Sequence, residues 1–580
     1  MKKLMLGNEA VARGLYEAGC RVVSSYPGTP STEITEVIST YDDVYSEWAP
    51  NEKVACEVAY GASMAGARSF CGMKHVGLNV AADPLFTAAY SGVNGGFVIA
   101  VADDSGMHSS QNEQDSRHYA AASKVPMLEP SDSAECLAFT KLAFEISERF
   151  DTPVILRLST RVSHSQGIVE ISERENLPLK EYVKRPEKYV MMPAYARGRH
   201  VVVEERTLKL KEYAQECPAN RIIEGGNIGV ITSGISYQYA HEALGDKATY
   251  LKIGLAHPMS EKMLKDFASR FDKVYVIEEL DSIIEDFCKA NGICCVGKEL
   301  FSPIGEYTAT AIRKAILNEE KPYITVEENV PVRPPVLCPG CPHRGIFYTL
   351  NKLRLFVSGD IGCYTLGACA PLSALDTTIC MGASISGLHG FNKARGSEWE
   401  KKSVAVIGDS TFIHSGITGL IDIAYNASNS TVIILDNSIT GMTGHQQNPT
   451  TGYNIKGDPA TAVNLEALCK AVGIERVRVV DPFDVDGVEA ALKEELAADA
   501  PSVIIARRPC ALLKVVKAKP PVTVDSEKCR KCGMCFKMGC PAIKKTEEGK
   551  PEIDTTLCTG CGLCTKACKF DALKENEHGG

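Results

Sequence analysis

The segment SVAVIGDSTFIHSGITGLIDIAYNASNSTVIILDNS, residues 403–438, decides the fold class of this chain. An apolar run at 403–407 and a second one at 431–435 each end in polar residues, as buried strands of an α/β sheet do. Between them, apolar residues recur at the spacing of a helix face, at Leu420, Ile423, Ala424 and Ala427. A strand, a helix and a strand in this order form a βαβ unit, so we predict an α/β fold with doubly wound parallel sheets.

The polar residues that follow the two predicted strands include Asp409 and Asn437. Because the carboxyl ends of parallel strands meet at one edge of a sheet, where such folds bind ligands, we expect these side chains to lie close together. Their oxygens suit Mg2+, which takes further ligands from substrate phosphates. Gly408 would let the backbone approach a diphosphate, and Ser410 could donate to it. The alternative is an ordinary strand end capped by an aspartate.

Eight cysteines near the end of the chain form two runs. The first has the pattern Cys-x2-Cys-x2-Cys-x4-Cys from Cys529, and the second has Cys-x2-Cys-x2-Cys-x3-Cys from Cys558. In bacterial two-cluster ferredoxins, the fourth cysteine of each run ligates the cluster of the other run. We therefore predict two [4Fe–4S] clusters, one held by Cys529, Cys532, Cys535 and Cys568, the other by Cys558, Cys561, Cys564 and Cys540. Two zinc sites, each with four thiolates, are the alternative.

The composition is that of a globular protein with several domains. No apolar run in the 580 residues reaches the ~20 residues needed to span a bilayer. A formal net charge of −9 argues against a nucleic-acid surface. The start, MKKLMLGNEA, lacks the pattern of a secretory signal, so we expect a cytoplasmic location. In that reducing compartment, the 23 cysteines are expected to bind metal or to do redox chemistry rather than to form disulfides.

Three stretches rich in proline and charged residues suggest domain boundaries. They lie near 175–200, 319–336 and 513–523. We therefore predict four domains, at residues 1–180, 195–320, 335–515 and 522–575. The second of these contains apolar runs followed by helical patterns, and no catalytic set is visible in it.

The N-terminal domain contains a predicted helix, NEKVACEVAYGASMAGARS, at residues 51–69. Small residues that allow close packing recur along one face, at Ala55, Ala59, Ser63 and Ala67. Glu52 lies in the first turn, where the helix dipole favours an acid. Glu52 could therefore be only a stabilising end charge, and the residues alone do not separate that role from a functional one.

The sequence resembles thiamine-diphosphate enzymes and, more closely, the 2-oxoacid:ferredoxin oxidoreductases. GDS…LDNS resembles the GDG…NN signature of thiamine enzymes, with Ser410 and Asp436 as departures. YPGTPSTEI (26–34) and the helix at 51–69 are similar to segments of the oxidoreductases. The resemblance implies a pyrimidine-binding domain, a transketolase C-terminal-like domain, a diphosphate- and magnesium-binding domain and a small ferredoxin-like α+β domain, in that order.

The resemblance also implies roles for individual residues. It makes Asp409, Asn437 and the carbonyl of Ile439 the ligands of Mg2+. It makes Glu52 the partner of the aminopyrimidine ring, with Gly28 close to the cofactor and Thr29 facing the 2-oxoacid. The loop TGMTGHQ (440–446) would border the reactive ring, so His445 is a candidate catalytic residue or simply a hydrogen-bonding one.

Other members of this family hold the substrate carboxylate with an arginine just after the strand that matches GFVIAVADD (96–104). The segment that follows in this chain has no arginine near its start. The candidate substitutes are His108, Ser109 and Arg117.

Four further cysteines could form a third metal site: Cys338, Cys341, Cys363 and Cys510. They could instead hold zinc or be buried thiols. Related oxidoreductases hold a cluster beside the thiamine with ligands in CPGC, GIGC and PC contexts, and all four counterparts are present here. A third cluster is therefore an open alternative.

The resemblance implies an enzyme that oxidatively decarboxylates a 2-oxoacid, transfers the acyl group to coenzyme A and passes electrons through its clusters to ferredoxin. The domain order and the phrase MKHVGLNVAADPL (73–85) are similar to the branch that converts aryl pyruvates, indolepyruvate among them, to arylacetyl-CoA. The gamma domain of the family has no counterpart in the sequence, so we expect a small beta subunit in a heterodimer or a dimer of heterodimers. Alternatives are the same chemistry on pyruvate or 2-oxoglutarate, a non-oxidative thiamine decarboxylase, and an electron-transfer subunit with an inactive thiamine site.

Overall fold

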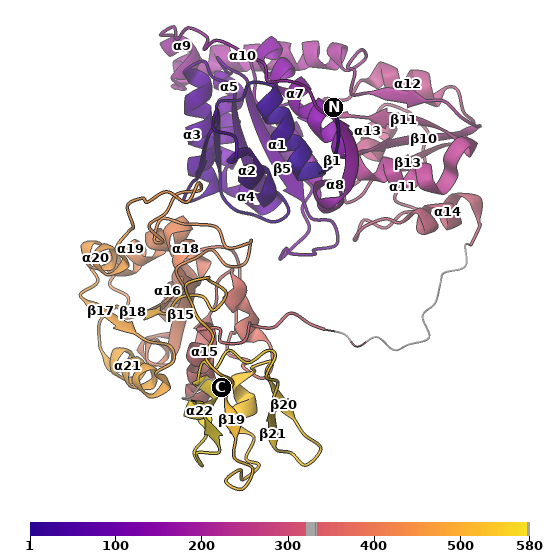
Figure 1. Ribbon diagram of the computed structural model, residues 1–580. Coiled ribbons are helices and arrows are strands. Elements are labelled where there is room, and N and C mark those ends of the chain that lie inside the picture. The colour runs from indigo at the N-terminus through magenta and orange to yellow at the C-terminus, as the bar shows by residue number, and fades with distance from the viewer. Residues whose placement is uncertain (321–330, 332, 577–580) are drawn as a thin grey trace. The chain divides into compact units, whose positions relative to one another are not determined.

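The computed structural model describes residues 1–320, 331 and 333–576, and the chain divides into two compact units (Figure 1). The units are Met1–Glu327 and Glu328–Gly580. The predicted boundary at 319–336 lies for the most part outside the described residues. Each unit contains a mainly parallel sheet, so the predicted α/β class is confirmed.

The first unit is organised around a seven-stranded sheet with the order β12-β6-β7-β5-β4-β2-β3. Neighbouring strands are parallel except for β12 and β6. The strands are β2 (Val22–Ser25), β3 (Tyr45–Trp48), β4 (Ser69–Lys74), β5 (Phe97–Asp103), β6 (Met127–Leu128), β7 (Val154–Ser159) and β12 (Leu255–His257). The central strands β4 and β5 are buried along their whole length, as expected of a parallel sheet covered on both faces.

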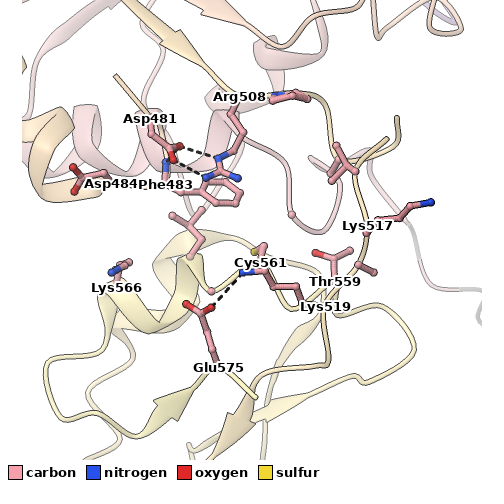
Figure 2. Close-up of a pocket in the computed structure, with 17 residues that line it drawn as sticks. Asp481, Phe483, Asp484, Arg508, Lys517, Lys519, Thr559, Cys561, Lys566 and Glu575 are labelled. Atoms are coloured by element: carbon pink, nitrogen blue, oxygen red, sulfur yellow. Dashed lines mark hydrogen bonds and ion pairs between the residues drawn. The ribbon is translucent and has the colours of Figure 1, made fainter. Parts of the chain in front are cut away.

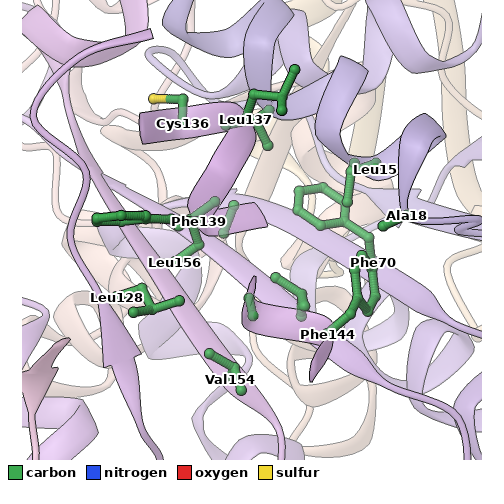
Figure 3. Close-up of a cluster of buried hydrophobic side chains, with 14 of the residues drawn as sticks. Leu15, Ala18, Phe70, Leu128, Cys136, Leu137, Phe139, Phe144, Val154 and Leu156 are labelled. Atoms are coloured by element: carbon green, nitrogen blue, oxygen red, sulfur yellow. The ribbon is translucent and has the colours of Figure 1, made fainter. Parts of the chain in front are cut away.

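The core of this sheet has two sides, because successive residues of β5 point to opposite faces. Val98 and Ala100 join a hydrophobic cluster with side chains of α1 (Gly7–Glu17) and α7 (Ser133–Phe150), part of which Figure 3 shows. Ile99 joins a second cluster with side chains of α3 (Glu52–Met64). Burying one such aliphatic side chain stabilises a fold by about 1.5–3 kcal/mol, so this double core holds the strand ends in place.

Shorter helices and a hairpin complete this part of the first unit. Strand β1 (Lys2–Leu6) pairs with β8 (Gln166–Glu170) in an antiparallel ladder. The other helices are α2 (Thr32–Ile38), α4 (His75–Val80), α5 (Ala82–Ser91), α6 (Arg117–Ser123), α8 (Thr160–His164) and α9 (Pro186–Tyr189).

Helix α10 (Pro193–Tyr213) begins within the predicted boundary at 175–200 and packs on the first domain. Its Arg206 donates to the carbonyl of Ala89, in the last turn of α5, at 2.7 Å. It also donates to the carbonyl of Asp151, which caps α7, at 2.8 Å. Arg206 therefore stabilises two helix C-termini, where a cation is favoured.

A four-stranded sheet with the order β13-β10-β11-β9 forms the rest of the first unit. Its strands are β9 (Arg221–Ile223), β10 (Ile228–Ser233), β11 (Ala248–Ile253) and β13 (Val274–Ile277). Its helices are α11 (Gly234–Leu244), α12 (Glu261–Ala268), α13 (Ile283–Ala290) and α14 (Ala309–Leu317), with a short 3₁₀ turn, η1 (Gly245–Lys247). The next strand along the chain after β11, β12, leaves this sheet and pairs with β6 of the larger one.

The second unit contains a parallel five-stranded sheet with the order β14-β15-β16-β18-β17. Strands β15 (Ser403–Gly408) and β16 (Thr431–Asp436) are neighbours, which confirms the predicted βαβ unit. The connecting helix α19 (Ile417–Tyr425) ends before Ala427, because the backbone there turns to a φ of 47°. A short π-helical turn, η3 (Phe412–Gly416), precedes it.

Further elements surround this sheet. The other strands are β14 (Phe356–Ser358), β17 (Arg476–Val480) and β18 (Ser502–Arg507). The helices are α15 (His343–Leu353), η2 (Cys363–Ala368), α16 (Ala383–Arg395), α17 (Ser397–Glu400), α18 (Asp409–Thr411), α20 (Leu465–Ala471) and α21 (Val485–Ala497).

The C-terminal part of the second unit consists of two short antiparallel strand pairs and two short helices. Strand β19 (Thr523–Val524) pairs with β22 (Leu573–Lys574), and β20 (Ile543–Lys545) pairs with β21 (Pro551–Ile553). The helices are η4 (Met534–Met538) and α22 (Leu563–Ala567). Among the described helices of the chain, none is long and apolar enough to cross a membrane.

Candidate active site

Asp409 and Asn437 lie at the carboxyl ends of the neighbouring strands β15 and β16, and both are buried. One terminal atom of the Asn437 amide lies 2.7 Å from the carbonyl oxygen of Ile439 and 3.2 Å from Asp409 Oδ1. With the amide nitrogen in that place, Asn437 donates to both oxygens. With the amide oxygen there, three oxygens converge, which is the arrangement that a divalent cation stabilises. The two predicted strand ends therefore meet, and their donor set fits Mg2+.

The charge on Asp409 supports the same interpretation. Burial and the neighbouring negative charge of Asp436 raise the pKa of Asp409 to about 7. Asp436 itself accepts from Arg507 at 2.6 Å, whereas Asp409 forms no ion pair among the described residues. Asp409 accepts from the Ser410 backbone at 2.8 Å and from Thr450 Oγ1 at 3.2 Å, and the Asn448 side chain is a further hydrogen-bond partner. A bound cation would supply the positive charge that this buried carboxylate lacks.

The sequence analysis did not predict three residues that shape this site. Thr450 orients Asp409, as just described. The ring of Tyr364 packs so closely on Gly408 that a side-chain carbon at 408 would lie 2.7 Å from it. Asp360 accepts from the backbone of Gly382 and Ser384 at 2.9 Å each, and so anchors the start of α16. Asp360 could have been found, because it follows β14 closely, as Asp409 follows β15.

The loop after β16 contributes Thr440 and His445, which contact different neighbours. Thr440 Oγ1 donates to Ser410 Oγ at 3.0 Å, beside the strand ends. His445 Nε2 lies 3.9 Å from Cys510 Sγ. The structure thus brings His445 to a cysteine, and its catalytic role stays a prediction.

The four cysteines predicted as a third site, here called the inner cysteines, come from three segments of the chain: Cys338, Cys341, Cys363 and Cys510. Burial and then the charges of Cys510 and Cys338 raise the pKa of Cys363 to about 12. Burial followed by the charges of Cys363 and Cys338 raises the pKa of Cys341 as well. The inner cysteines therefore lie within electrostatic reach of one another.

The inner cysteines also adjoin the strand-end site. Asp409 contributes to the raised pKa of Cys363 and of Cys510, after burial and the nearer cysteines. A side-chain carbon on Gly441 would lie 3.7 Å from both the Asn437 amide and Cys363 Sγ. A redox centre held by these thiols would therefore lie beside the predicted magnesium ligands.

The eight cysteines of the two C-terminal runs, here called the tail cysteines, surround two separate cavities. One is lined by Cys529, Cys532, Cys535 and Cys568. The other is lined by Cys540, Cys558, Cys561 and Cys564. Each cavity receives three cysteines of one run and the fourth of the other. Among the described residues, no group of three His, Cys, Asp or Glu side chains is placed to hold a single metal ion.

Arg344 connects the inner cysteines with the tail. Its buried guanidinium donates to the carbonyl of Cys338 at 3.2 Å and to that of Met538 at 3.0 Å. It also donates to the carbonyls of Leu337 and Gly539. One cation thus holds the CPGC loop against the loop that precedes Cys540, and it lies near cysteines of both groups.

A cavity of about 470 Å³ in the second unit lies beside the tail (Figure 2). Its lining includes Cys561 of the tail and Arg508, which is paired with Asp481 and lies over the ring of Phe483. Three lysines add positive charge to its lining: Lys517, Lys519 and Lys566.

In the first unit, Glu52 begins α3 and is buried. The N-cap of α3 is Asn51, whose side chain accepts from the Val54 backbone at 2.9 Å. The Glu52 carboxyl packs on Gly77 of α4 so closely that a side-chain carbon at 77 would lie 2.6 Å from Oε1. Only glycine fits there, so Glu52 is held by packing as well as by its place at the start of the helix.

Gly28 and Thr29 lie in the loop that follows β2 and are half-buried. A side-chain carbon on Gly28 would lie 3.1 Å from Lys74 Cβ, at the end of the adjacent strand β4. The Thr29 carbonyl accepts from Ser109 Oγ at 3.4 Å. The carboxyl ends of β2, β4 and β5 thus bring these residues together, at the edge where α/β sheets bind ligands.

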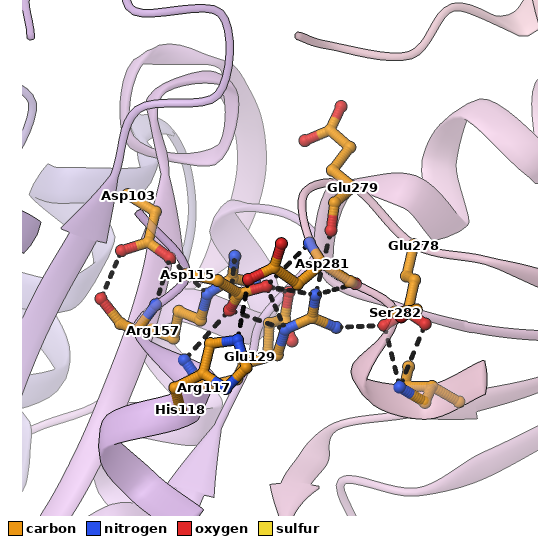
Figure 4. A network of polar contacts seen from close by, with 12 residues as sticks. Asp103, Asp115, Arg117, His118, Glu129, Arg157, Glu278, Glu279, Asp281 and Ser282 are labelled. Atoms are coloured by element: carbon orange, nitrogen blue, oxygen red, sulfur yellow. Dashed lines mark hydrogen bonds and ion pairs between the residues drawn. The ribbon is translucent and has the colours of Figure 1, made fainter. Parts of the chain in front are cut away.

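Arg117 is not available as a substrate anchor. It is buried in a polar network, where it donates to Asp115 at 2.6 Å and to Glu278 at 2.5 Å (Figure 4). Asp115 and Glu278 already satisfy its charge, so Arg117 joins the two sheets of the first unit. His108 pairs with Glu306 at 3.0 Å. Of the predicted substitutes, only Ser109 lies against Thr29.

Comparisons with known proteins agree with this arrangement. A family model described as "Pyruvate flavodoxin/ferredoxin oxidoreductase, thiamine diP-bdg" matches residues 13–218. A model of the "Thiamine pyrophosphate enzyme, C-terminal TPP binding domain" matches 360–506, and a "4Fe-4S binding domain" matches 551–574.

Relatives match over nearly the whole chain. "Indolepyruvate oxidoreductase subunit IorA" of Archaeoglobus fulgidus is 42% identical over 99% of this chain and 97% of its own length. The protein of the same name from Pyrococcus abyssi is 41% identical, with the same coverage. Among solved structures, a 2-oxoglutarate:ferredoxin oxidoreductase from Magnetococcus marinus is 18% identical over 55% of this chain and 65% of that chain, with a TM-score of 0.45.

The fold and the site define an enzyme that uses thiamine diphosphate and an iron–sulfur centre to oxidise a 2-oxoacid, with electron transfer of the ferredoxin type. This is a 2-oxoacid:ferredoxin oxidoreductase. Within that class, the identity to curated relatives over nearly the full length shows that the chain belongs to the indolepyruvate oxidoreductase IorA family. The name of these relatives as a subunit implies a partner chain.

Proposed function

We propose that this chain, with a partner subunit, converts aryl pyruvates such as indolepyruvate to arylacetyl-CoA. One 2-oxoacid, one coenzyme A and two oxidised ferredoxins would give one acyl-CoA, one carbon dioxide, one proton and two reduced ferredoxins. The observation that carries the proposal is the adjacency of the Asp409 and Asn437 strand ends to the inner cysteines. The names of the relatives support the aryl substrate.

In the second unit, Asp409, Asn437 and the carbonyl of Ile439 would hold Mg2+ together with the cofactor diphosphate. Their three oxygens are the hard ligands that this ion takes, and Asp409 needs a cation. Gly408 and Ser410 would lie against the diphosphate. When bound, thiamine diphosphate supplies the chemistry that removes carbon dioxide, and the protein supplies orientation and electrostatics.

In the first unit, Glu52 would hydrogen-bond the aminopyrimidine ring, and Gly28 and Thr29 would border the cofactor and the 2-oxoacid. Glu52 suits this role because it is buried at the start of a well-capped helix and is packed on Gly77. A carboxyl held in this way loses little conformational entropy when it meets a ligand.

Electrons would pass from the inner cysteines to the tail cysteines. We propose a third cluster on the inner cysteines and one [4Fe–4S] cluster in each of the two tail cavities. The arrangement of the thiols around these places, and the Arg344 connection between them, support this path. Ferredoxin would then take the electrons, and a small beta subunit would complete a heterodimer or a dimer of heterodimers.

The test is an anaerobic reduction assay with the chain and its copurifying subunit, thiamine diphosphate, Mg2+ and coenzyme A. Reduction that requires coenzyme A and that is fastest with indolepyruvate would support the proposal. Faster turnover of pyruvate or 2-oxoglutarate would contradict the aryl substrate. Decarboxylation without reduction would indicate a non-oxidative decarboxylase, and the proposal would fall.

Glu52 is tested by Glu52→Gln, which keeps the size of the side chain and removes its charge. We expect the cofactor to bind with little change, and turnover to fall by about 100-fold or more, because a proton-transfer role contributes on this scale. Glu57→Gln is the matched control, because Glu57 lies in the same helix and pairs only with exposed Lys53. Equal turnover of the Glu52→Gln variant and the wild type would mean that another acid contacts the ring.

A further inference from the structure

Lys74 is a buried cation of the first unit that lacks an anion. It ends β4, and only 7% of the residue is exposed. Its Nζ donates to the Ser109 carbonyl at 2.7 Å and lies 3.4 Å from Ser109 Oγ. No carboxylate of the described residues forms an ion pair with it. Burial lowers the pKa of Lys74 to about 8, and Asp104, which is not in contact, only partly offsets this.

The other buried cations of the first unit are all compensated. Arg117 and Arg157 contact carboxylates, and Lys252 is paired with Glu135 at 2.5 Å. Arg206 has no ion pair among the described contacts, but it stabilises the C-termini of α5 and α7. Lys74 has one loop carbonyl and a distant hydroxyl. An ammonium has three donors, and a buried one costs several kcal/mol unless it is paired, so the surroundings of Lys74 are incomplete.

Lys74 also lies where the substrate is expected. Its Cβ is within van der Waals distance of the place that a side chain on Gly28 would occupy, and its partner Ser109 contacts Thr29. The residues that follow it form α4, on which the Glu52 carboxyl packs through Gly77. Arg117, the arginine that follows β5 in the chain, is engaged with Glu278.

We propose that the Lys74 ammonium binds the carboxylate of the 2-oxoacid substrate. The inference rests on the proposed function. A carboxylate fits because it is the anion that every 2-oxoacid carries, and because the cofactor diphosphate is assigned to Asp409 in the second unit. The Ser109 carbonyl orients the ammonium, and the substrate supplies the missing charge. An ammonium binds a carboxylate as a compact point charge rather than as a bidentate fork.

The test compares a charged ligand with a neutral one in the holoenzyme with its subunit. The measurements are kcat/KM for indolepyruvate and the inhibition constant of indolepyruvate methyl ester, which lacks the charge and is larger by one methyl group. In Lys74→Met we expect kcat/KM to fall by about 100-fold or more, the scale for removing one partner of a buried charge pair. The ester should inhibit this variant and the wild type equally, within about threefold.

Two further variants separate anchoring from a structural role. Lys74→Arg should recover much of kcat/KM, because it keeps the charge. Lys74→Gln keeps a donor for the Ser109 carbonyl without the charge, should fold even if Lys74→Met does not, and should resemble Lys74→Met in kcat/KM. Lys262→Gln, at an exposed lysine of the first unit that pairs with Asp266, is the matched control and should keep the preference for acid over ester.

Equal losses of acid and ester binding in Lys74→Gln would show that Lys74 only supports the loop, and an unchanged kcat/KM would overturn the inference outright. In either case the wild type would still reduce dye with a 2-oxoacid. Failure of the wild type with every 2-oxoacid is a different result, and it would remove the proposed function itself.

Discussion

The inner cysteines and the tail cysteines reach similar arrangements by different routes. All eight tail cysteines lie within one short segment near the C-terminus, and their spacing alone assigns them to two sets. The inner cysteines come from the CPGC loop, from η2 and from the segment after β18, so only the folded diphosphate domain brings them together. Local spacing therefore specifies the thiols of the proposed outer redox centres, whereas the tertiary fold specifies those of the centre proposed beside Asp409.

This difference suggests different roles for the inner cysteines and the tail cysteines. A centre that the diphosphate domain assembles is held at a fixed place beside the cofactor site, as one-electron transfer from that site requires. Centres on a small separate domain are suited to passing electrons onward to a partner. Substitutions at successive points along the proposed electron path, from the cofactor site through the inner cysteines to the tail cysteines, test these different roles. The expected effects become smaller from the cofactor site outward.

The largest effect is expected at Asp409, which lies at the proposed cofactor site and so precedes both cysteine groups on the proposed electron path. Asp409→Ala removes a ligand of the proposed Mg2+, so binding of thiamine diphosphate should weaken by about 100-fold or more, and turnover should fall with it. Calorimetric titration of the cofactor with Mg2+ present measures this, and iron content should not change. Asp481→Ala, which breaks the surface pair with Arg508 and a bond from the Phe483 backbone, is the control. Unaltered cofactor binding in Asp409→Ala would remove the thiamine site from these strand ends.

The next effect is expected at the inner cysteines. Cys341→Ala should leave cofactor binding intact but lower substrate-dependent reduction of every acceptor by about 100-fold or more, because the first electron acceptor would be lost. Iron analysis should show the loss of one cluster. Cys469→Ala, at a buried thiol among the apolar side chains of the same domain, is the matched control. Full iron content in Cys341→Ala would mean that the inner cysteines are buried thiols and hold no cluster.

A smaller and selective effect is expected in the tail. Cys532→Ala should abolish reduction of ferredoxin, while a small dye that reaches the inner centre keeps a substantial rate. Parallel assays with ferredoxin and with the dye measure this, and Cys369→Ala, at another exposed cysteine, is the control. Equal loss of both activities would contradict the assigned order of the two groups, as would full retention of ferredoxin reduction.

The smallest effect is expected at Arg344, which connects the two groups. Arg344→Gln removes hydrogen bonds to four carbonyls, two of them buried, so the second unit should lose about 1–3 kcal/mol of unfolding free energy, and ferredoxin reduction should slow severalfold. Thermal unfolding of the reconstituted protein and stopped-flow reduction measure the two effects. Arg508→Gln, at a half-exposed ion pair, should cost less than about 1 kcal/mol. An equal, small loss of unfolding free energy in both variants would show that the Arg344 hydrogen bonds between the CPGC loop and the tail contribute no more than a surface ion pair.

The sequence predicted those parts of the site that depend on local pattern. The βαβ unit, with Asp409 and Asn437 at its strand ends, is confirmed because buried strands and their polar ends are visible in single runs of residues. Helix α19 is shorter than its apolar spacing suggests, because a turn at Ala427 ends it. The grouping of the tail cysteines also follows from spacing, and their ligation remains a prediction.

The remaining parts depend on partners that are distant in sequence. The sequence made Arg117 a reasonable candidate for binding the substrate carboxylate. In the fold, however, Arg117 donates to Glu278, which follows a strand of the other sheet. Lys74 gave no signal in the sequence, because a lysine at a strand end is usually exposed, and only the fold shows that it is buried without an anion. Arg344 likewise acquires its role only when the tail folds against the CPGC loop.

The most direct test of the central claim mixes the anaerobic holoprotein with indolepyruvate and coenzyme A, without any acceptor. Visible absorbance of the iron–sulfur centres is followed together with release of carbon dioxide. We predict that the centres are reduced as carbon dioxide is released, with two electrons per molecule, and that Asp409→Ala shows neither change. Release of carbon dioxide and an aldehyde, with the centres still oxidised, would contradict the claim that these cysteines receive electrons from the thiamine site.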